Sequence, residues 1–271
     1  MNSNIKIFSI ISTVTFALIF LCSQALAGLV IERIYAQGPK SDKKNVTKMV
    51  SYFQDNKVKT IEPNGDYTIV DLDKGTMTMV DTEKKEYYST TLDAMLQQMQ
   101  KGMDKIKAHL KGLSPEQRSM IEKMMGMSQG SGTKLSLKKV ADSQKIAGYE
   151  AEHYVISQNG KKVGEYWVSK QLRNKMYKEL DKDKIEKFEK AMSNISNQLN
   201  VFGKSSMTEL MDMEEKLQKK GEIVKQIHYP NTVNMNMEGS FQEVVSVKEE
   251  NIPPSAFTVP KDFKHKSAQQ H

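Results

Sequence analysis

The sequence contains few of the residues that build covalent or metal-based frameworks. Its 271 residues include one cysteine, Cys22, and one tryptophan, Trp167. A single cysteine cannot form an internal disulfide and supplies no cysteine-rich zinc site. Because Cys22 precedes the cleavage site predicted below, we also expect the mature chain to have no thiolate nucleophile.

Motifs of catalysis are missing as well. The five histidines are scattered, so no pair stands at the helical spacing of a zinc protease. There is no Gly-x-Ser-x-Gly elbow, and no Gly-Lys-Ser/Thr of a phosphate loop follows the glycines of residues 126–132. Asp71 and Asp73 resemble the start of a calcium loop. Gly75 and Thr82 stand where that loop has acidic ligands, so a β-turn is favoured. We therefore expect no enzymatic activity and no cofactor.

Arginine is scarce too. Three of the 40 basic residues are arginine, namely Arg33, Arg118 and Arg173, and the formal net charge is +7. The lysines alternate with acidic residues, as in residues 181–190, which is typical of a solvated surface. A nucleic-acid interface has clustered arginine with interleaved aromatic residues, so nucleic acid is not an expected partner. Weak attraction to anionic lipid head groups stays open.

The one long apolar run lies at the start of the chain. Residues 7–21 follow Lys6 and are fewer than the roughly 20 residues that span a bilayer. The small residues around Ala27 then predict a signal peptide over residues 1–27, cleaved after Ala27 to give a periplasmic or secreted protein. A membrane anchor is the alternative, and Leu21 disfavours acylation of Cys22. An exported chain without disulfides fits a bacterial envelope.

The clearest β-structure signal is the stretch of residues 67–88. Apolar and polar residues alternate there with period two, which predicts strands. Residues 71–75 and 81–85 carry turn chemistry, and Gly75 accommodates a positive φ. We predict an antiparallel meander in the middle of the sheet.

Other segments continue this alternation of strands and helices. Further strands are expected at residues 29–36, 46–53, 57–62, 134–141, 149–157, 163–169, 222–229, 233–237 and 240–248. A first helical block has apolar residues at spacings of three and four over residues 92–110, with Thr90 as N-cap and a second helix starting at Ser114. A second block covers residues 177–200 and a helix from Ser206.

These elements predict one α+β domain over residues 28–263. Its strands suit a strongly curved antiparallel sheet, an incomplete β-barrel, covered by the two helical blocks. The proline-rich residues 252–260 should lie extended against the sheet, anchored by Phe257 and Val259. We expect residues 264–271 to be a disordered tail.

Methionine is unusually abundant in the chain, with 18 residues. Flexible thioether side chains suit a cover for an adaptable apolar ligand, with the glycines of residues 126–132 as its hinge. Ordinary core filling and soft-metal (Cu(I)) binding are the alternatives, although no histidine or cysteine accompanies the methionines. We predict no metal site but an apolar cavity, where the methionines of the first helical block pack over the concave face of the sheet. Its lining would be Met77, Met79, Met95, Met99, Met103, Met120, Met124, Trp167, Met235 and Met237.

Short motifs along the chain resemble a family of exported bacterial proteins of unknown function. These motifs are residues 69–74 with 85–87, residues 146–149 with Tyr154, residues 165–168, and Ile252, Phe257 and Pro260. That family is similar in turn to periplasmic lipoprotein carriers and receptors of the LolA and LolB type. The resemblance implies a half-barrel whose apolar concave side shields a lipid or acyl chain beneath helices. It carries over no catalytic residue.

The sequence therefore favours a non-enzymatic periplasmic binding or carrier protein. The expected partner is a lipid or an acylated protein, with an envelope protein as a further partner and no transmembrane segment after processing. A methionine-rich metal-binding or envelope stress protein and a plain protein-interaction module are the competing hypotheses.

Overall fold

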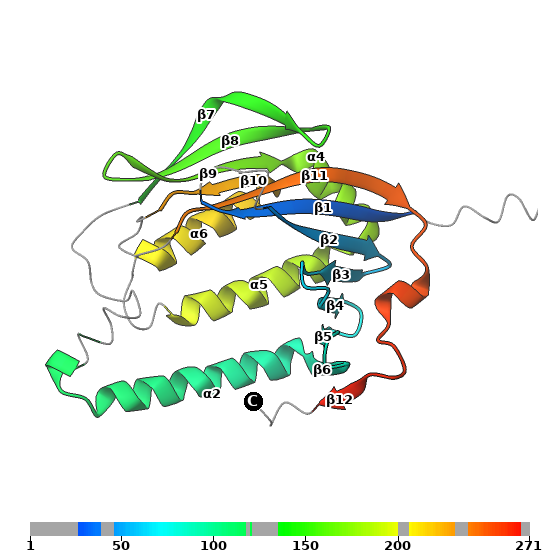
Figure 1. The fold of residues 1–271 in the computed structure, drawn as a ribbon. Helices are drawn as coiled ribbons and strands as arrows, with labels where there is room; N and C mark the ends of the chain where they lie inside the picture. The colour runs from blue at the N-terminus through cyan, green and yellow to red at the C-terminus, as the bar shows by residue number, and fades with distance from the viewer. Residues whose placement is uncertain are drawn as a thin grey trace, which may run out of the picture.

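The computed structural model of the chain describes residues 27–38, 46–117, 120, 135–199, 206–230 and 238–266 (Figure 1). Within these ranges twelve strands form one open sheet, in the order β12-β6-β5-β4-β3-β2-β1-β11-β10-β9-β8-β7. The strands are β1 Gly28–Gln37, β2 Thr47–Gln54, β3 Lys57–Ile61, β4 Tyr67–Asp71, β5 Thr76–Asp81, β6 Glu86–Thr91, β7 Leu135–Ile146, β8 Tyr149–Gln158, β9 Lys161–Ser169, β10 Glu222–His228, β11 Ser240–Glu250 and β12 Lys264–Lys266.

The predicted meander is confirmed, but it lies near one edge of the sheet and not in its middle. Strands β4, β5 and β6 pair antiparallel in sequence order, with Tyr67 opposite Val80 and Val80 opposite Tyr87. Tight turns join them because residues there accept left-handed backbone angles, with φ of 60° at Gly75 and 53° at Lys85. Asp71 and Asp81 secure these turns by accepting hydrogen bonds from the backbone N–H groups three residues on.

Helices lie inside the curve of the sheet. They are α2 Leu92–Lys111, α4 Lys170–Glu179, α5 Lys182–Leu199 and α6 Ser206–Gln218. Figure 1 shows the sheet bending around them, from β7 at the top to β6 and β12 at the bottom. Helix α4 contacts β1, β2, β8 and β10, α6 contacts β7 and β10, and α2 contacts α5 and β6. The α+β class with a curved open sheet is therefore confirmed, and none of the described helices is long and apolar enough to cross a membrane.

The apolar core fills the space between the sheet and these helices. One cluster of buried residues joins strands and α4, and Ile185 and Phe188 of α5 pack against it. A second cluster joins Leu210 and Leu217 of α6 to β7, β8 and β9. Tyr166 of β9 fixes α6 further, since its hydroxyl donates a 2.7 Å hydrogen bond to Glu214. One face of the sheet is thus tied to the helices by both apolar and polar contacts.

Two helix boundaries differ from the sequence prediction. The N-cap of α2 is Thr91 and not Thr90, because the Thr91 hydroxyl accepts a hydrogen bond from the N–H of Ala94. The expected helix over residues 177–200 is two helices: α4 begins after its N-cap Ser169, and α5 follows a break at Leu180 and Asp181. Asp181 accepts a hydrogen bond from the N–H of Lys184 and so caps α5. Apolar residues keep their helical spacing across this break, so the sequence pattern predicted one continuous helix.

The end of the chain returns to the first half of the sheet. Phe257, Val259 and Phe263 pack against buried residues of β4 and β5, so the predicted anchors Phe257 and Val259 are confirmed. A 3-10 turn, η2 Pro254–Phe257, interrupts the expected extended segment. The prediction of a disordered tail from residue 264 is wrong for Lys264–Lys266, which form β12 and pair parallel with β6. The sheet is therefore mixed and not purely antiparallel.

Candidate functional site

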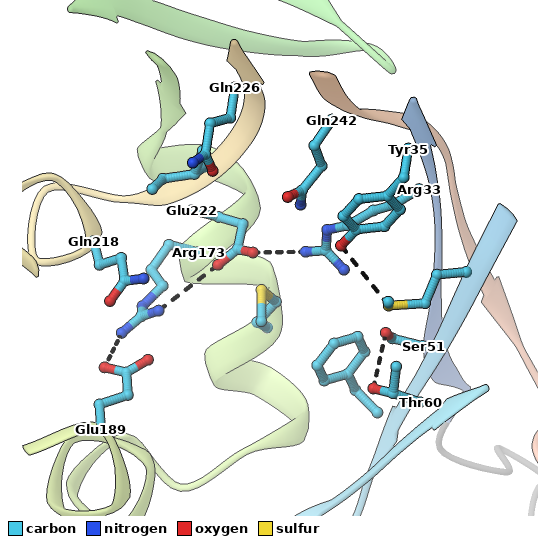
Figure 2. Close-up of a pocket in the computed structure, with 14 residues that line it drawn as sticks. Arg33, Tyr35, Ser51, Thr60, Arg173, Glu189, Gln218, Glu222, Gln226 and Gln242 are labelled. Carbon is cyan, nitrogen blue, oxygen red and sulfur yellow. Dashed lines mark hydrogen bonds and ion pairs between the residues drawn. The ribbon is translucent and has the colours of Figure 1, made fainter. Parts of the chain in front are cut away.

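A pocket of about 430 Å³ lies between the helix-covered face of the sheet and helices α4, α5 and α6 (Figure 2). Its volume falls within the range of about 300–1,000 Å³ that small-molecule sites occupy. The lining residues are Arg33, Tyr35, Met49, Ser51, Phe53, Thr60, Arg173, Met176, Glu189, Gln218, Glu222, Ile223, Gln226 and Gln242. Most of them are polar or charged, which differs from the apolar cavity that the sequence predicted.

The strand register places the sheet part of this lining on one face. Tyr35 of β1 stands opposite Gln242 of β11, and Gln242 stands opposite Gln226 of β10. Residues directly opposite each other across a sheet point to the same side. Arg33, two residues before Tyr35, shares that side because strand side chains alternate. Four side chains from three neighbouring strands therefore converge on the pocket.

Helix α4 brings the second arginine to the pocket. Glu222 at the start of β10 pairs with Ser169, the N-cap of α4, so Glu222 lies beside the first turn of that helix. Gly221 allows this close approach, since a Cβ there would lie 2.7 Å from the carbonyl carbon of Ser169. Arg173 and Met176, one turn apart on α4, then both reach the pocket.

A chain of ion pairs crosses the pocket. One Glu222 oxygen lies 2.6 Å from Nη2 of Arg33, and the other lies 3.7 Å from Nη1 of Arg173. Nη2 of Arg173 is 2.5 Å from Glu189 of α5, and its Nε donates a 2.8 Å hydrogen bond to the Tyr177 hydroxyl. Figure 2 shows Glu222 between the two guanidinium groups. We call Arg33, Glu222, Arg173 and Glu189 the pocket ion chain.

The environment shifts the pKa of two groups in the pocket, Arg173 and Tyr35. Burial alone would lower the pKa of Arg173, but the hydrogen bond and charge of Glu189, together with Tyr177 and Glu222, outweigh it and raise that pKa. Burial is also the main cause of the raised pKa of Tyr35, so its phenol stays protonated. The Tyr35 hydroxyl donates to the sulfur of Met49, at 3.8 Å. The pocket therefore combines fixed charges with an aromatic and thioether wall.

A second charged cluster surrounds Trp167 of β9, which belongs to the same buried core cluster as Leu172 and Met176 of α4. Trp167 follows Tyr166 in β9 and so points away from α6, and its ring stacks on His153 with centroids 4.2 Å apart. The His153 ring nitrogens lie 2.9 Å from Glu165 and 3.1 Å from Asp142. Glu165 also accepts hydrogen bonds from Lys162 and from the Tyr229 hydroxyl. We call Trp167, His153, Glu165, Lys162, Tyr229 and Asp142 the Trp167 cluster.

The described methionines do not gather around the pocket as predicted. Met77 and Met79 of β5 stand opposite Val70 and Thr68 of β4, so all four share one face, and Val70 packs on the core beside α4 and α5. Met79 nonetheless has 41% of its surface exposed and Met99 of α2 has 39%. Met95 and Met103 are partly buried, and neither lines the pocket.

The remaining predicted residues are dispersed or lie outside the described chain. Six strands separate β5 from β9 in the sheet, and Trp167 of β9 belongs to the cluster on the face opposite Tyr166. Met120 is 67% exposed. Met124, Met235, Met237 and the glycine-rich hinge of residues 126–132 lie outside the described residues. Two methionines that the sequence did not single out, Met49 and Met176, do line the pocket.

The arginines were the signal that sequence reasoning passed over. Two of the three, Arg33 and Arg173, line the pocket, whereas the 40 basic residues are otherwise nearly all lysine. Arginine is preferred over lysine where a cation is buried or binds a carboxylate or phosphate in two places. A scarce arginine in a lysine-rich chain therefore indicates a buried position, and two of them indicate a shared site.

Comparisons with other proteins add no identity to this geometry. The chain matches no protein-family model, and no curated protein is similar to it. Over the described residues, no group of three or more His, Cys, Asp or Glu side chains is placed to hold a metal ion. The pocket and its ion chain are consequently the features on which a function can be argued.

Proposed function

We propose that the protein is a non-enzymatic binding protein of the bacterial envelope that holds a single-chain lipid or acyl group in the pocket. The observation that carries this proposal is the pocket of about 430 Å³ between sheet and helices, whose lining joins apolar side chains to fixed charges. Phe53 and Met176 belong both to this lining and to the buried core, so the apolar wall is continuous with the interior. Such a surface suits a molecule with a chain and a polar head.

The shape of the sheet supports the same proposal. A curved sheet that bends around helices is the arrangement expected of an incomplete β-barrel with a helical cover, and the pocket lies between these two layers. The pocket volume is near the lower end of the range for ligand sites, which favours one chain over the several acyl chains of a lipoprotein. The apolar run of residues 7–21 supports export to the periplasm.

Native mass spectrometry of the protein purified from bacterial cells tests the proposal. We expect one bound lipid or fatty acid per chain, and binding of one equivalent of dodecanoate after delipidation. Gln242→Trp would place an indole in the pocket and should abolish binding. Val245→Trp is the matched control, because Val245 on the same strand is 42% exposed and does not line the pocket.

Two results would contradict the proposal. The first is a protein that carries no lipid and binds no dodecyl compound. The second is equal binding by both tryptophan variants, which would place the lipid elsewhere. In the first case the hypothesis of a plain interaction module takes precedence, and pull-down with envelope proteins becomes the next measurement.

A further inference from the structure

We infer that the pocket selects amphiphiles with an anionic head group, a carboxylate or a phosphate, and that Glu222 competes internally with that head group for Arg33 and Arg173. This inference rests on the proposed function and names the chemistry of its ligand. Three features of the pocket ion chain support it: the burial of its charges, the unequal position of Glu222, and the Gln242 amide beside it.

The cations of the pocket are more buried than the anions. The side chains of Arg33 and Arg173 are each 10% exposed, whereas Glu222 is 16% exposed and Glu189 is 35% exposed. Water screens the charge of an exposed carboxylate more strongly than that of a buried guanidinium. Although the four charges sum to zero, the inner part of the pocket is therefore positive. An anionic group gains from that potential, and an ammonium group does not.

Glu222 leaves hydrogen-bonding capacity on the guanidinium groups. Its contact with Nη1 of Arg173 is 3.7 Å, which is beyond hydrogen-bond distance, while its contact with Arg33 is 2.6 Å. A guanidinium has five N–H donors in a planar fork that matches the oxygens of a carboxylate or phosphate. Nη1 of Arg173 can accordingly donate a hydrogen bond to a ligand oxygen while Arg173 keeps its bonds to Glu189 and Tyr177.

The surroundings of this position suit the two ends of an amphiphile. Figure 2 shows the amide of Gln242 near Arg33, and no dashed line joins Gln242 to another of the residues drawn. The amide nitrogen of the neighbouring Gln226 already lies 3.3 Å from Glu214 and 2.6 Å from Nε2 of His228. The amide N–H of Gln242 could bond a further head-group oxygen. Phe53, Met49 and Met176 also line the pocket. The flexible thioethers of the two methionines adapt to an alkyl chain.

Four dodecyl probes with different heads test the inference by isothermal titration calorimetry on the delipidated protein: dodecanoate, dodecyl phosphate, dodecyltrimethylammonium and dodecanol. We expect dodecanoate or dodecyl phosphate to bind about tenfold or more tightly than the other two, which is the effect of one charge-assisted hydrogen bond. The ratio between the two anions decides whether the ligand class is a carboxylate or a phosphate.

Substitutions in the ion chain have opposite expected effects. Arg173→Met should remove the preference for anions, and Arg173→Lys, which keeps the charge but loses the fork, should retain part of it. Glu222→Gln should tighten anion binding several-fold, because it removes the internal competitor. A purely structural role of Glu222 predicts weaker binding instead. Lys85→Gln, which removes an exposed ion pair with Asp262, is the control for loss of one positive charge.

The outcomes separate this inference from the proposed function. If no dodecyl probe binds, the proposed function fails. If all four bind with similar affinity, the protein is a lipid binder without head-group selection and the inference fails alone. Tighter binding of dodecyltrimethylammonium, or weaker anion binding by a folded Glu222→Gln variant, overturns it as well. Thermal unfolding of each variant shows whether it is folded.

Discussion

The pocket ion chain and the Trp167 cluster use similar groups in two parts of the molecule, yet their carboxylates are placed differently. Glu165 has a close partner for each oxygen: His153 on one, and Lys162 and Tyr229 on the other. Glu222 has one close partner and one at 3.7 Å, and it borders a pocket. We expect from this comparison that the saturated cluster mainly stabilises the fold, while the unsaturated one beside the cavity takes part in the proposed binding.

The largest expected effect comes from removing the two central carboxylates. Glu165→Ala removes one partner of His153 and the carboxylate that Lys162 contacts, at a site where the Glu165 side chain is 9% exposed. We expect it to lower the free energy of unfolding by about 3 kcal/mol. Glu222→Ala should lower it by about 1 kcal/mol, because pocket water can hydrate the arginines it leaves. Urea unfolding followed by circular dichroism measures both.

Equal losses in the two variants would contradict this assignment of roles. A larger loss for Glu222→Ala would make the pocket ion chain the structural cluster. Lys225→Ala provides a control, since it breaks a 2.9 Å ion pair with Glu243 near Trp167 without touching Glu165.

The dependence of stability on pH sharpens the comparison. Burial alone would raise the pKa of Glu165, but hydrogen bonds from Tyr229 and Lys162 and the charges of Lys162 and His153 outweigh it, so the pKa lies below its ordinary value of 4.5. A carboxyl whose pKa is lowered by folding stabilises the fold above pH 4.5 and loses that contribution as the pH falls through the folded pKa. Burial and Glu165 raise the pKa of Tyr229 to about 12, so it remains a donor throughout.

We therefore expect the free energy of unfolding to fall less steeply below pH 4.5 in the Glu165→Gln variant than in the unchanged protein. The comparison of denaturant midpoints between pH 3 and pH 6 measures the difference (about three pH values suffice). An unchanged acid slope would show that other carboxylates, such as Glu152 and Glu215, carry the effect, since hydrogen bonds from lysines lower their pKa values as well.

A small effect is expected from the methionine helix α2. Met99 is 39% exposed and does not line the pocket, so Met99→Asp should change the free energy of unfolding by less than about 0.5 kcal/mol and leave dodecanoate binding intact. Loss of binding in this variant would restore the hypothesis that α2 covers the ligand. Met176→Asp, in the pocket and 7% exposed, is the positive control.

The smallest expected effect is the response of Trp167 to a ligand. As the only tryptophan, it reports on its own cluster. Because Trp167 does not line the pocket, dodecanoate should leave its emission maximum unchanged, whereas Glu165→Ala should shift that maximum to the red. A ligand-induced shift as large as the one caused by Glu165→Ala would show that the pocket and the Trp167 cluster are coupled.

The sequence predicted the elements of this fold better than their assembly. Alternation at Tyr67, Ile69 and Val80 specified the meander, because period two and turn residues are local signals. The pairing of β1 with β11 has no local signal, since it joins strands from both ends of the chain. The parallel addition of β12 is hidden for the same reason, as its three residues are mostly lysine.

The candidate site was predictable only in part. The pattern of Met95, Met99 and Met103 correctly marked one helix face, but a helical stripe does not state which surface it contacts. Arg33 and Arg173 are 140 positions apart and meet only because β10, which carries Glu222, begins beside the N-cap of α4. The scarcity of arginine in the sequence could have singled out these two residues. Only the pairing of the strands in the structure shows that they meet.

The position of β1 in the middle of the sheet has a consequence for the order of folding. Its neighbours are β2, which follows it directly, and β11, whose Glu250 pairs with Gly28. The meander of β2 to β6 and the group β7 to β9 can each form as their residues are synthesised, but β1 keeps one unpaired edge until β11 exists. Unpaired edges recruit strands of other chains, and pairing between distant segments is slow. A newly made chain would therefore be most prone to aggregate in the interval before its two halves join at β1.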